Sequence, residues 1–312
     1  MIYQKLRGTD LKVSEIGLGT NAVGGHNLFT DLNEVDGIEM VDAALQLGIT
    51  FIDTADIYGK GRSEEHIGEV LTKYNRADVV IATKGGRRWF ADGSVVVDNT
   101  PQYLRNALES SLHRLKTDYV DLYYLHYPDT KTPLAEAIGE LTKLKQEGKI
   151  KAIGISNVSL EQLKEANVHG DISVMQSSYH LLDRSAEERI LPYTRENNIS
   201  FIPYGPLAYG LLGGKYTEDF ELAEGDWRRS LPLFEKETFK KNLKIVSSLK
   251  ELAEEKETTV TNLSLAWLLS QEGVDAVIPG GKRKEQVTIN SRTSDVTFTQ
   301  KDLNIIEGII KN

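Results

Sequence analysis

Four side chains capable of acid–base chemistry stand at or just after the ends of short apolar segments in the first half of the chain. Asp53, Lys84 and His126 each end such a segment, and Tyr58 follows Asp53 after a short gap. Lys84 is the most informative of the four, because an ammonium directly after an apolar strand needs either a partner or a function. We expect all four side chains to meet at one end of a sheet or barrel.

Each of the four residues also has an ordinary structural explanation when taken alone. Asp53 could cap a helix or form a structural ion pair. Tyr58 could pack its ring with the hydroxyl in water, and His126 could be a satisfied buried histidine. A carboxylate, a phenol, an ammonium and an imidazole at one edge favour the functional interpretation.

This set of groups suits the reduction of a carbonyl. Hydride delivery to a C=O leaves an alkoxide that must be protonated as it forms. Tyr58 is a plausible acid if its pKa, about 10 when unperturbed, is drawn toward neutrality. We expect the Lys84 ammonium to lower that pKa and Asp53 to keep Lys84 charged and in place. His126 would hydrogen-bond the substrate oxygen and share the developing charge.

The elements that must position these residues alternate between short strands and longer amphipathic helices. The strand candidates are rich in Val and Ile, as is typical of strands covered on both faces. They are Ile16–Leu18, Thr50–Asp53, Val79–Thr83, Val120–Leu125, Ile150–Ile155, Ser173–Gln176, Ser200–Tyr204 and Asp275–Pro279. Helix starts are predicted at Thr100-Pro101, at Thr132-Pro133 and at a capping box that begins at Ser159. Helix ends are expected near Gly48, Gly148 and Gly170.

The predicted fold class is α/β, a (β/α)8 TIM barrel with an N-terminal β-hairpin at residues 2–13, in a single domain over residues 1–312. Eight strand-then-helix units without a break in composition favour it. A doubly wound sheet is the alternative, but no Gly-x-Gly-x-x-Gly follows the first strand. Two long connections, 85–99 and 205–236, would lie over the carboxyl face, where barrel sites form.

Composition excludes several classes of function. A formal net charge of −9 argues against a nucleic-acid partner. The chain has 0 cysteines, which excludes disulfides, thiolate chemistry and cysteine-bound metals. The segment His126-Tyr127-Pro128-Asp129 contains too few metal-binding side chains to predict a metal site. The chain lacks a signal-like amino terminus and any apolar run long enough for a bilayer. We therefore predict a cytoplasmic protein with no membrane partner.

The residues and their surroundings resemble the aldo-keto reductase family over essentially the whole chain. The resemblance rests on the four residues in order, on 53–59 (DTADIYG), on 118–126 (DYVDLYYLH), on 153–157 (IGISN) and on 278–280 (IPG). It implies an NADP-dependent reductase of aldehydes or ketones, working reversibly, with Tyr58 as proton donor, Lys84 and Asp53 assisting it, and His126 orienting the carbonyl. Its partner would be a small carbonyl or alcohol substrate, and the protein a monomer or small homo-oligomer.

The resemblance also implies a dinucleotide site along the successive strand ends. Ser156, Asn157 and Gln176 match residues that bind the nicotinamide carboxamide, and Tyr204 matches the aromatic on which that ring stacks. The full implied set is Gly19, Thr20, Asn21, Asp53, Ser156, Asn157, Gln176, Tyr204, Gly205, Pro206, Leu207, Lys215, Gly280, Lys282, Arg283, Gln286 and Asn290.

The cations Lys282, Arg283 and Lys284 open the segment after the eighth strand. Cations at a helix amino terminus suit a 2′-phosphate, so NADP(H) is predicted over NAD(H). Ile289 departs from the family pattern, in which many relatives carry a glutamate that faces the adenine. Residues 19–27 and 215–220 resemble a bacterial branch associated with inositol catabolism.

The substrate pocket is expected to be largely aromatic. Its predicted walls, besides Tyr58, are His26, Phe29, Trp89, Phe90, Tyr127 and Trp227. Arg87 and Arg88 lie in the loop after Lys84, where they could meet an anionic substrate or simply be solvated. Apolar walls discriminate modestly, by about 1–3 kcal/mol per methylene.

Two other functions remain open. Lys84 could form a Schiff base, as in aldolases on a barrel. Some aldo-keto reductase relatives instead act as nicotinamide-binding regulatory or redox-sensing proteins with little turnover, which an intact set of four catalytic residues disfavours.

Overall fold

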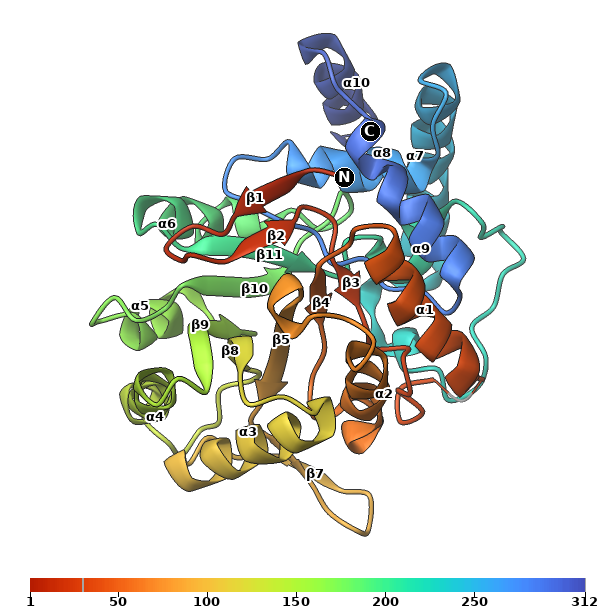
Figure 1. The fold of residues 1–312 in the computed structure, drawn as a ribbon. Helices are drawn as coiled ribbons and strands as arrows, with labels where there is room; N and C mark the ends of the chain where they lie inside the picture. The colour runs from red at the N-terminus through yellow and green to blue at the C-terminus, as the bar shows by residue number, and fades with distance from the viewer. Residues whose placement is uncertain (30, 312) are drawn as a thin grey trace.

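A parallel sheet occupies the centre of the molecule in the computed structural model, which describes residues 1–29 and 31–311 (Figure 1). Seven strands follow the order β3-β4-β5-β8-β9-β10-β11. Their bounds are Leu18–Gly19 (β3), Phe51–Asp53 (β4), Val80–Gly85 (β5), Val120–Leu125 (β8), Ile150–Ser156 (β9), Val174–Ser178 (β10) and Ser200–Tyr204 (β11). Seven of the predicted strand segments are therefore present, with shifted ends in most of them.

The eighth position of the barrel is held by residues 274–280, which bridge the two edges of this sheet. Val274 pairs with Phe201 of β11, and Val277 and Gly280 pair with Ile16 and Gly19 at the other edge. The connection is a set of isolated parallel bridges, because Pro279 has no backbone N–H to donate to a continuous ladder. The ring is nevertheless complete, so the predicted (β/α)8 barrel is confirmed.

Helices surround the strands and cover their outer faces, as Figure 1 shows. They are α1 (Glu34–Gln46), α2 (Arg62–Leu71), α3 (Pro101–Leu115), α4 (Leu134–Gln146), α5 (Leu160–Ala166), α6 (Ile190–Glu196), α7 (Lys236–Glu255), α8 (Val260–Leu269), α9 (Lys284–Ser291) and α10 (Gln300–Lys311). Within the residues described, no helix combines the length and apolar character needed to cross a membrane.

The predicted helix boundaries are partly correct. The capping box at Ser159 is present, with reciprocal bonds between Ser159 and Gln162. Pro101 opens α3, but the Thr100 side chain makes no cap bond. The cap predicted at Thr132 is wrong: Pro133 precedes α4, and the Thr132 hydroxyl donates to Asp129 at 2.9 Å instead.

The N-terminal hairpin closes the amino-terminal end of the barrel. Its strands β1 (Tyr3–Lys5) and β2 (Lys12–Ser14) pair antiparallel, as predicted. Leu6, Leu11 and Val13 are buried in one apolar cluster with inward-facing residues of the barrel strands. Closing one end with apolar side chains leaves the carboxyl end as the opening of the barrel.

The long connection predicted at 85–99 carries structure that the sequence analysis missed. β6 (Arg87–Trp89) and β7 (Val95–Val97) pair as an antiparallel hairpin at the edge of the molecule (Figure 1). All three residues of β7 are exposed. The connection at 205–236 contains short 3₁₀ turns at Ala208–Gly213, Trp227–Ser230 and Pro232–Phe234. Whether residues 1–312 behave as one domain stays a prediction.

Candidate active site

An ion pair between Lys84 and Asp53 lies at the carboxyl ends of neighbouring strands β5 and β4. Lys84 Nζ donates to Asp53 Oδ1 at 2.5 Å and to the carbonyl oxygen of Thr54 at 2.8 Å. The two side chains are 1% and 3% exposed, so both charges are out of water. Burial alone would lower the pKa of Lys84, but Asp53 and Tyr58 outweigh it and raise that pKa above its ordinary value. The ammonium therefore stays charged.

Tyr58 is positioned by an unusual turn directly after β4. The turn spans Tyr58–Gly61, and Gly59 has φ 60° and ψ 22°. A Cβ on Gly59 would lie 1.9 Å from the carbonyl oxygen of Gly24, so only glycine fits there. Asn27 holds both sides of Tyr58, donating to the Ile57 carbonyl at 3.0 Å and accepting from the Gly59 N–H at 2.7 Å. Sequence reasoning gave Asn27 no role.

The ring of Tyr58 faces both Lys84 and His126. Lys84 Nζ lies 5.4 Å from the Tyr58 ring centroid. The Tyr58 and His126 ring centroids are 6.3 Å apart, with the ring planes at 86°. The four residues predicted to act together, which we call the tetrad (Asp53, Tyr58, Lys84 and His126), therefore converge.

The pKa of Tyr58 differs from the expectation. Burial raises it, and the opposing effect of Lys84 is too small to reverse the shift, so the pKa stands above 10.0. The phenol is thus protonated at neutral pH, the form that a proton donor must have.

His126 is a neutral imidazole in this environment. Burial lowers its pKa well below 6.5, and the positive charges of Lys84 and Arg87 lower it further. Its side chain is buried, and Nδ1 has no hydrogen-bond partner among the residues that the structure describes. A buried polar atom without a partner costs free energy unless a ligand or water completes its bonding.

Polar side chains from three further strands connect to the tetrad. Gln176 donates to Asp53 Oδ2 at 2.9 Å. Asn157 donates to the His126 carbonyl at 2.9 Å, and its own Oδ1 accepts from the Tyr204 hydroxyl at 3.0 Å. Ser156 accepts a second bond from Asn157 at 3.0 Å. Residues predicted to hold a nicotinamide thus adjoin the predicted catalytic groups.

This donor set fits a nicotinamide. A carboxamide both donates and accepts, which the side chains of Ser156, Asn157 and Gln176 can match. Tyr204 is only partly buried at the end of β11, so its ring offers a face for stacking. At the neighbouring strand ends, the Cβ built on Gly280 lies 3.2 Å from Asn21 Oδ1 and from the Gly19 carbonyl, so these implied cofactor residues also lie together.

The predicted phosphate end carries an ion pair. Lys282 Nζ contacts Asp31 Oδ1 at 2.8 Å and lies 5.2 Å from the Phe29 ring centroid. The Lys282 backbone N–H donates to Gln286 Oε1 at 2.7 Å, just before α9. Arg283 and Lys215 are exposed. Any phosphate bound by Lys282 must therefore compete with Asp31.

The predicted pocket walls are distributed unevenly. Tyr127 lies beside His126, with ring centroids 5.1 Å apart. Trp227 packs on Tyr209 at 5.3 Å. The other four predicted wall residues contact charged groups. The Trp89 and Phe90 rings lie 5.9 Å and 5.1 Å from the guanidinium groups of Arg114 and Arg88, respectively. His26 lies 3.6 Å from Glu34, and Phe29 contacts Lys282.

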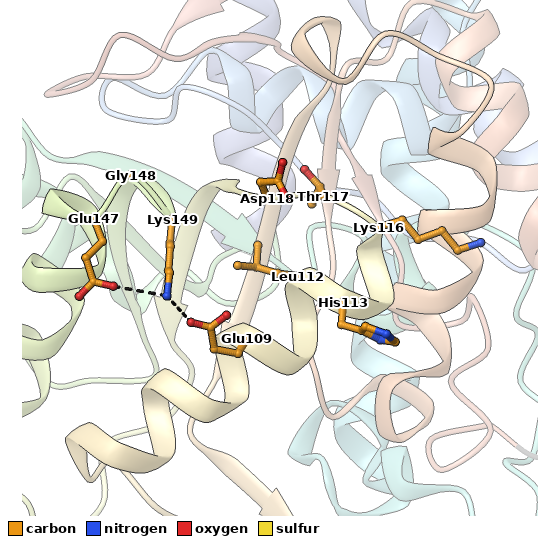
Figure 2. A pocket seen from close by; sticks show the side chains of 9 residues that line it. All are labelled: Glu109, Leu112, His113, Lys116, Thr117, Asp118, Glu147, Gly148 and Lys149. Atoms are coloured by element: carbon orange, nitrogen blue, oxygen red, sulfur yellow. Dashed lines mark hydrogen bonds and ion pairs between the residues drawn. The ribbon is translucent and has the colours of Figure 1, made fainter.

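A separate cavity of about 720 Å³ lies at the opposite end of the barrel, among the turns that lead into β8 and β9 (Figure 2). Lys149 crosses it and pairs with Glu109 and Glu147. None of its lining residues belongs to the tetrad. Among the described residues, no group of three His, Asp or Glu side chains could hold a metal ion.

Comparisons with known proteins agree with this geometry. The pattern of the Aldo/keto reductase family matches residues 15–311. The chain is 37% identical to aldo-keto reductase YhdN of Bacillus subtilis (strain 168), over 100% of this chain and 94% of the relative. It is 34% identical to the NADH-specific methylglyoxal reductase of Escherichia coli (strain K12), over 96% and 95%.

A solved structure, the glycerol dehydrogenase AKR11B4 from Gluconobacter oxydans, superposes with a TM-score of 0.92 at 33% identity, covering 99% of this chain and 94% of that one. The family match and this structural agreement both extend over nearly the whole chain. The chain belongs to the aldo/keto reductase family, whose members are nicotinamide-dependent oxidoreductases that act on carbonyl compounds.

Proposed function

We propose that this protein reduces aldehydes or ketones with NADPH and that Tyr58 donates the proton. The observation that carries the proposal is the convergence of the tetrad, in which a buried, charged Lys84 faces a protonated Tyr58. Family membership supplies the reaction class, and this arrangement supports the roles of the residues.

In the proposed reaction a bound nicotinamide supplies the hydride. The Tyr58 hydroxyl gives its proton to the oxygen as negative charge develops there. The Lys84 ammonium stabilises the phenolate that Tyr58 becomes, and Asp53 holds that ammonium by the 2.5 Å contact. The neutral His126 hydrogen-bonds the carbonyl oxygen and so fixes its direction.

The preference for NADPH rests on Lys282 and Arg283. We propose that the 2′-phosphate displaces Asp31 from Lys282, an exchange of one oxyanion for another. The E. coli relative is NADH-specific, so cofactor choice varies among similar chains. Substitution of Lys282 and Arg283 by Ala should weaken NADPH binding far more than NADH binding, measured by nucleotide fluorescence titration. An unchanged ratio of the two dissociation constants would reject this part of the proposal.

The test of function is a screen of aldehydes, ketones and inositol derivatives with NADPH and with NADH. Oxidation of the nucleotide with a carbonyl substrate supports the proposal. Tight nucleotide binding without turnover would favour a redox-sensing role instead. Borohydride trapping of a substrate adduct on Lys84 would favour Schiff-base chemistry, but the ion pair with Asp53 keeps Lys84 protonated and so non-nucleophilic.

The remaining expectations stay predictions. They are a cytoplasmic location, a monomeric or small oligomeric state, a setting in inositol catabolism, and roles for Gly205, Pro206, Leu207, Lys215 and Asn290 around the dinucleotide.

A further inference from the structure

Arg87 lies at the opening of the barrel, and its positive charge is not paired with a carboxylate in the described part of the chain. It begins β6, three residues after Lys84, and its guanidinium lies 5.3 Å from the ring centroid of Tyr127. Across residues 1–29 and 31–311, the Arg87 side chain makes this stacking contact and forms no hydrogen bond or ion pair. A guanidinium has five N–H donors, so its bonding capacity is available to a ligand.

The neighbouring arginines are engaged in a different way. Arg88 points to the other face of β6, where it pairs with Asp98 at 3.3 Å and lies over Phe90. Arg114 pairs with the buried Glu64 at 2.7 Å. Arg87 thus differs from both in having no carboxylate partner.

The position of Arg87 connects it to the predicted chemistry. Tyr127, on which it stacks, is itself 5.1 Å from the His126 ring. The Arg87 charge also contributes to lowering the pKa of His126, which places it within electrostatic range of the imidazole. Asp56 lies within similar range, but burial and the nearby Glu64 raise its pKa well above 3.8, which favours its uncharged form, and its side chain makes no ion pair with Arg87.

We propose that Arg87 binds an anionic group, a carboxylate or a phosphate, on the carbonyl compound that this protein reduces. The guanidinium fork matches both groups with paired hydrogen bonds, and stacking on Tyr127 fixes its plane. Oxo acids or phosphorylated aldehydes are then the preferred substrates over neutral aldehydes. This inference rests on the proposed reductase function and names the substrate class for the same site.

The kinetic test compares charged and uncharged members of matched pairs. The pairs are glyoxylate and 4-oxobutanoate with their methyl esters, and glyceraldehyde 3-phosphate with glyceraldehyde. Wild-type protein should favour the anion in at least one pair, and the pair concerned identifies carboxylate or phosphate. Arg87→Gln should reduce kcat/KM for that anion by about 10- to 100-fold, mainly through KM, and change the neutral partner by less than about threefold.

Arg88→Gln is the matched control, because it removes the adjacent positive charge from the same strand. It should leave the preference for the anion unchanged. The proposal is overturned if wild-type protein reduces the neutral member of every pair as well as the anion, or if Arg87→Gln weakens both members equally.

A binding measurement separates this inference from the proposed function. Calorimetry with 4-hydroxybutanoate, glycerol 3-phosphate and the uncharged 4-hydroxybutanamide, in saturating NADP⁺ or NAD⁺, needs no turnover. Binding of an anion that is lost in Arg87→Gln supports the site even if no carbonyl is reduced, an outcome that would reject the reductase function alone. Equal binding of anion and amide, or anion binding that survives Arg87→Gln, would overturn the role of Arg87.

Discussion

Two buried aspartates lie at opposite ends of the barrel. Each accepts hydrogen bonds from a positively charged side chain, but the two ion pairs have different roles. Asp121, near the start of β8, accepts from Arg76 at 2.8 Å, from Lys151 at 2.8 Å and from the Ile81 N–H at 2.9 Å. Asp53, at the end of β4, accepts from Lys84 at 2.5 Å and from Gln176 at 2.9 Å. Both carboxylates are well satisfied, so the number of their bonds does not distinguish them.

The difference lies in the groups around each carboxylate. Arg76 also bonds the carbonyls of Val79 and Tyr119 and the hydroxyl of Thr117, so its donors are in use at the closed end. At the opening, His126 Nδ1 has no partner within the described part of the chain. A buried ion pair thus marks a site of chemistry when polar atoms with free bonding capacity adjoin it. The predictions below test this distinction.

The largest effect is expected at the opening. Tyr58→Phe removes the hydroxyl proton donor and keeps the ring, so kcat should fall about 10²- to 10⁴-fold. Nucleotide binding and the urea midpoint of unfolding should stay close to wild type, since the ring still packs against its neighbours. Steady-state kinetics, fluorescence titration and urea unfolding measure the three quantities. Equal losses of activity and stability would mean that Tyr58 is structural.

The opposite pattern is expected at the closed end. Asp121→Ala leaves Arg76, Lys151 and the Ile81 N–H without their shared acceptor, and the free energy of unfolding should fall by about 3 kcal/mol. The kcat of the folded fraction should change less than about twofold, because no tetrad residue contacts Asp121. Urea unfolding and active-site-titrated kinetics provide the measurements. A large loss of kcat at full folding would contradict the division between the two ends.

The next prediction concerns how the free energy of unfolding depends on pH. His180, just after β10, is 1% exposed, and burial lowers its pKa from 6.5 to about 4. The unfolded state therefore binds a proton at His180 that the folded state does not bind. As a result, the free energy of unfolding falls as the pH drops from about 6.5 toward 4. The slope due to one such group is at most about 1.4 kcal/mol per pH unit.

His180→Gln should reduce that slope, and His113→Gln should not, because His113 is exposed on α3. Urea unfolding at intervals between pH 4.5 and 7 measures both variants. Identical slopes in the two variants would show that His180 is not held neutral.

The smallest effect is expected at the Asp31–Lys282 pair. Both side chains are largely exposed, at 70% and 41%, so Asp31→Asn should change the free energy of unfolding by less than about 1 kcal/mol. NADPH affinity should rise a few fold because the phosphate no longer competes with Asp31, and NADH affinity should not change. Nucleotide titrations at low ionic strength measure both constants. A parallel change in the two affinities would count against a phosphate contact at Lys282.

The tetrad could be predicted from the sequence because each member ends or follows a strand, and parallel strands bring their carboxyl ends to one edge. Asn27 could not, because its bonds to the backbone on either side of Tyr58 depend on how two loops meet. The direction of the Tyr58 pKa shift was predicted wrongly, because Lys84 was expected to lower that pKa. Spacing reveals that Lys84 is near, but burial, which raises the pKa of Tyr58, appears only in the folded chain.

The same distinction between local sequence patterns and contacts made only in the folded chain applies to the fold. Alternating strands and helices predicted the barrel, since periodicity is a local property of the chain. The β6–β7 hairpin was missed because the three exposed valines of β7 bury no face against the barrel. The cap at Thr132 was wrong because Asp129, three residues earlier, accepts the bond from its hydroxyl.

The hairpin that closes one end of the barrel limits how the nucleotide and the substrate can bind and leave. Because Leu6, Leu11 and Val13 pack against the apolar interior at one end, molecules can reach and leave the tetrad only from the carboxyl end of the barrel. Gln176 is 2% exposed and Tyr127 is 37% exposed, so Gln176 is the more deeply buried of the two. With the proposed nicotinamide against Gln176 and the substrate beside Tyr127, we expect the nucleotide to bind before the carbonyl compound and to leave after the alcohol.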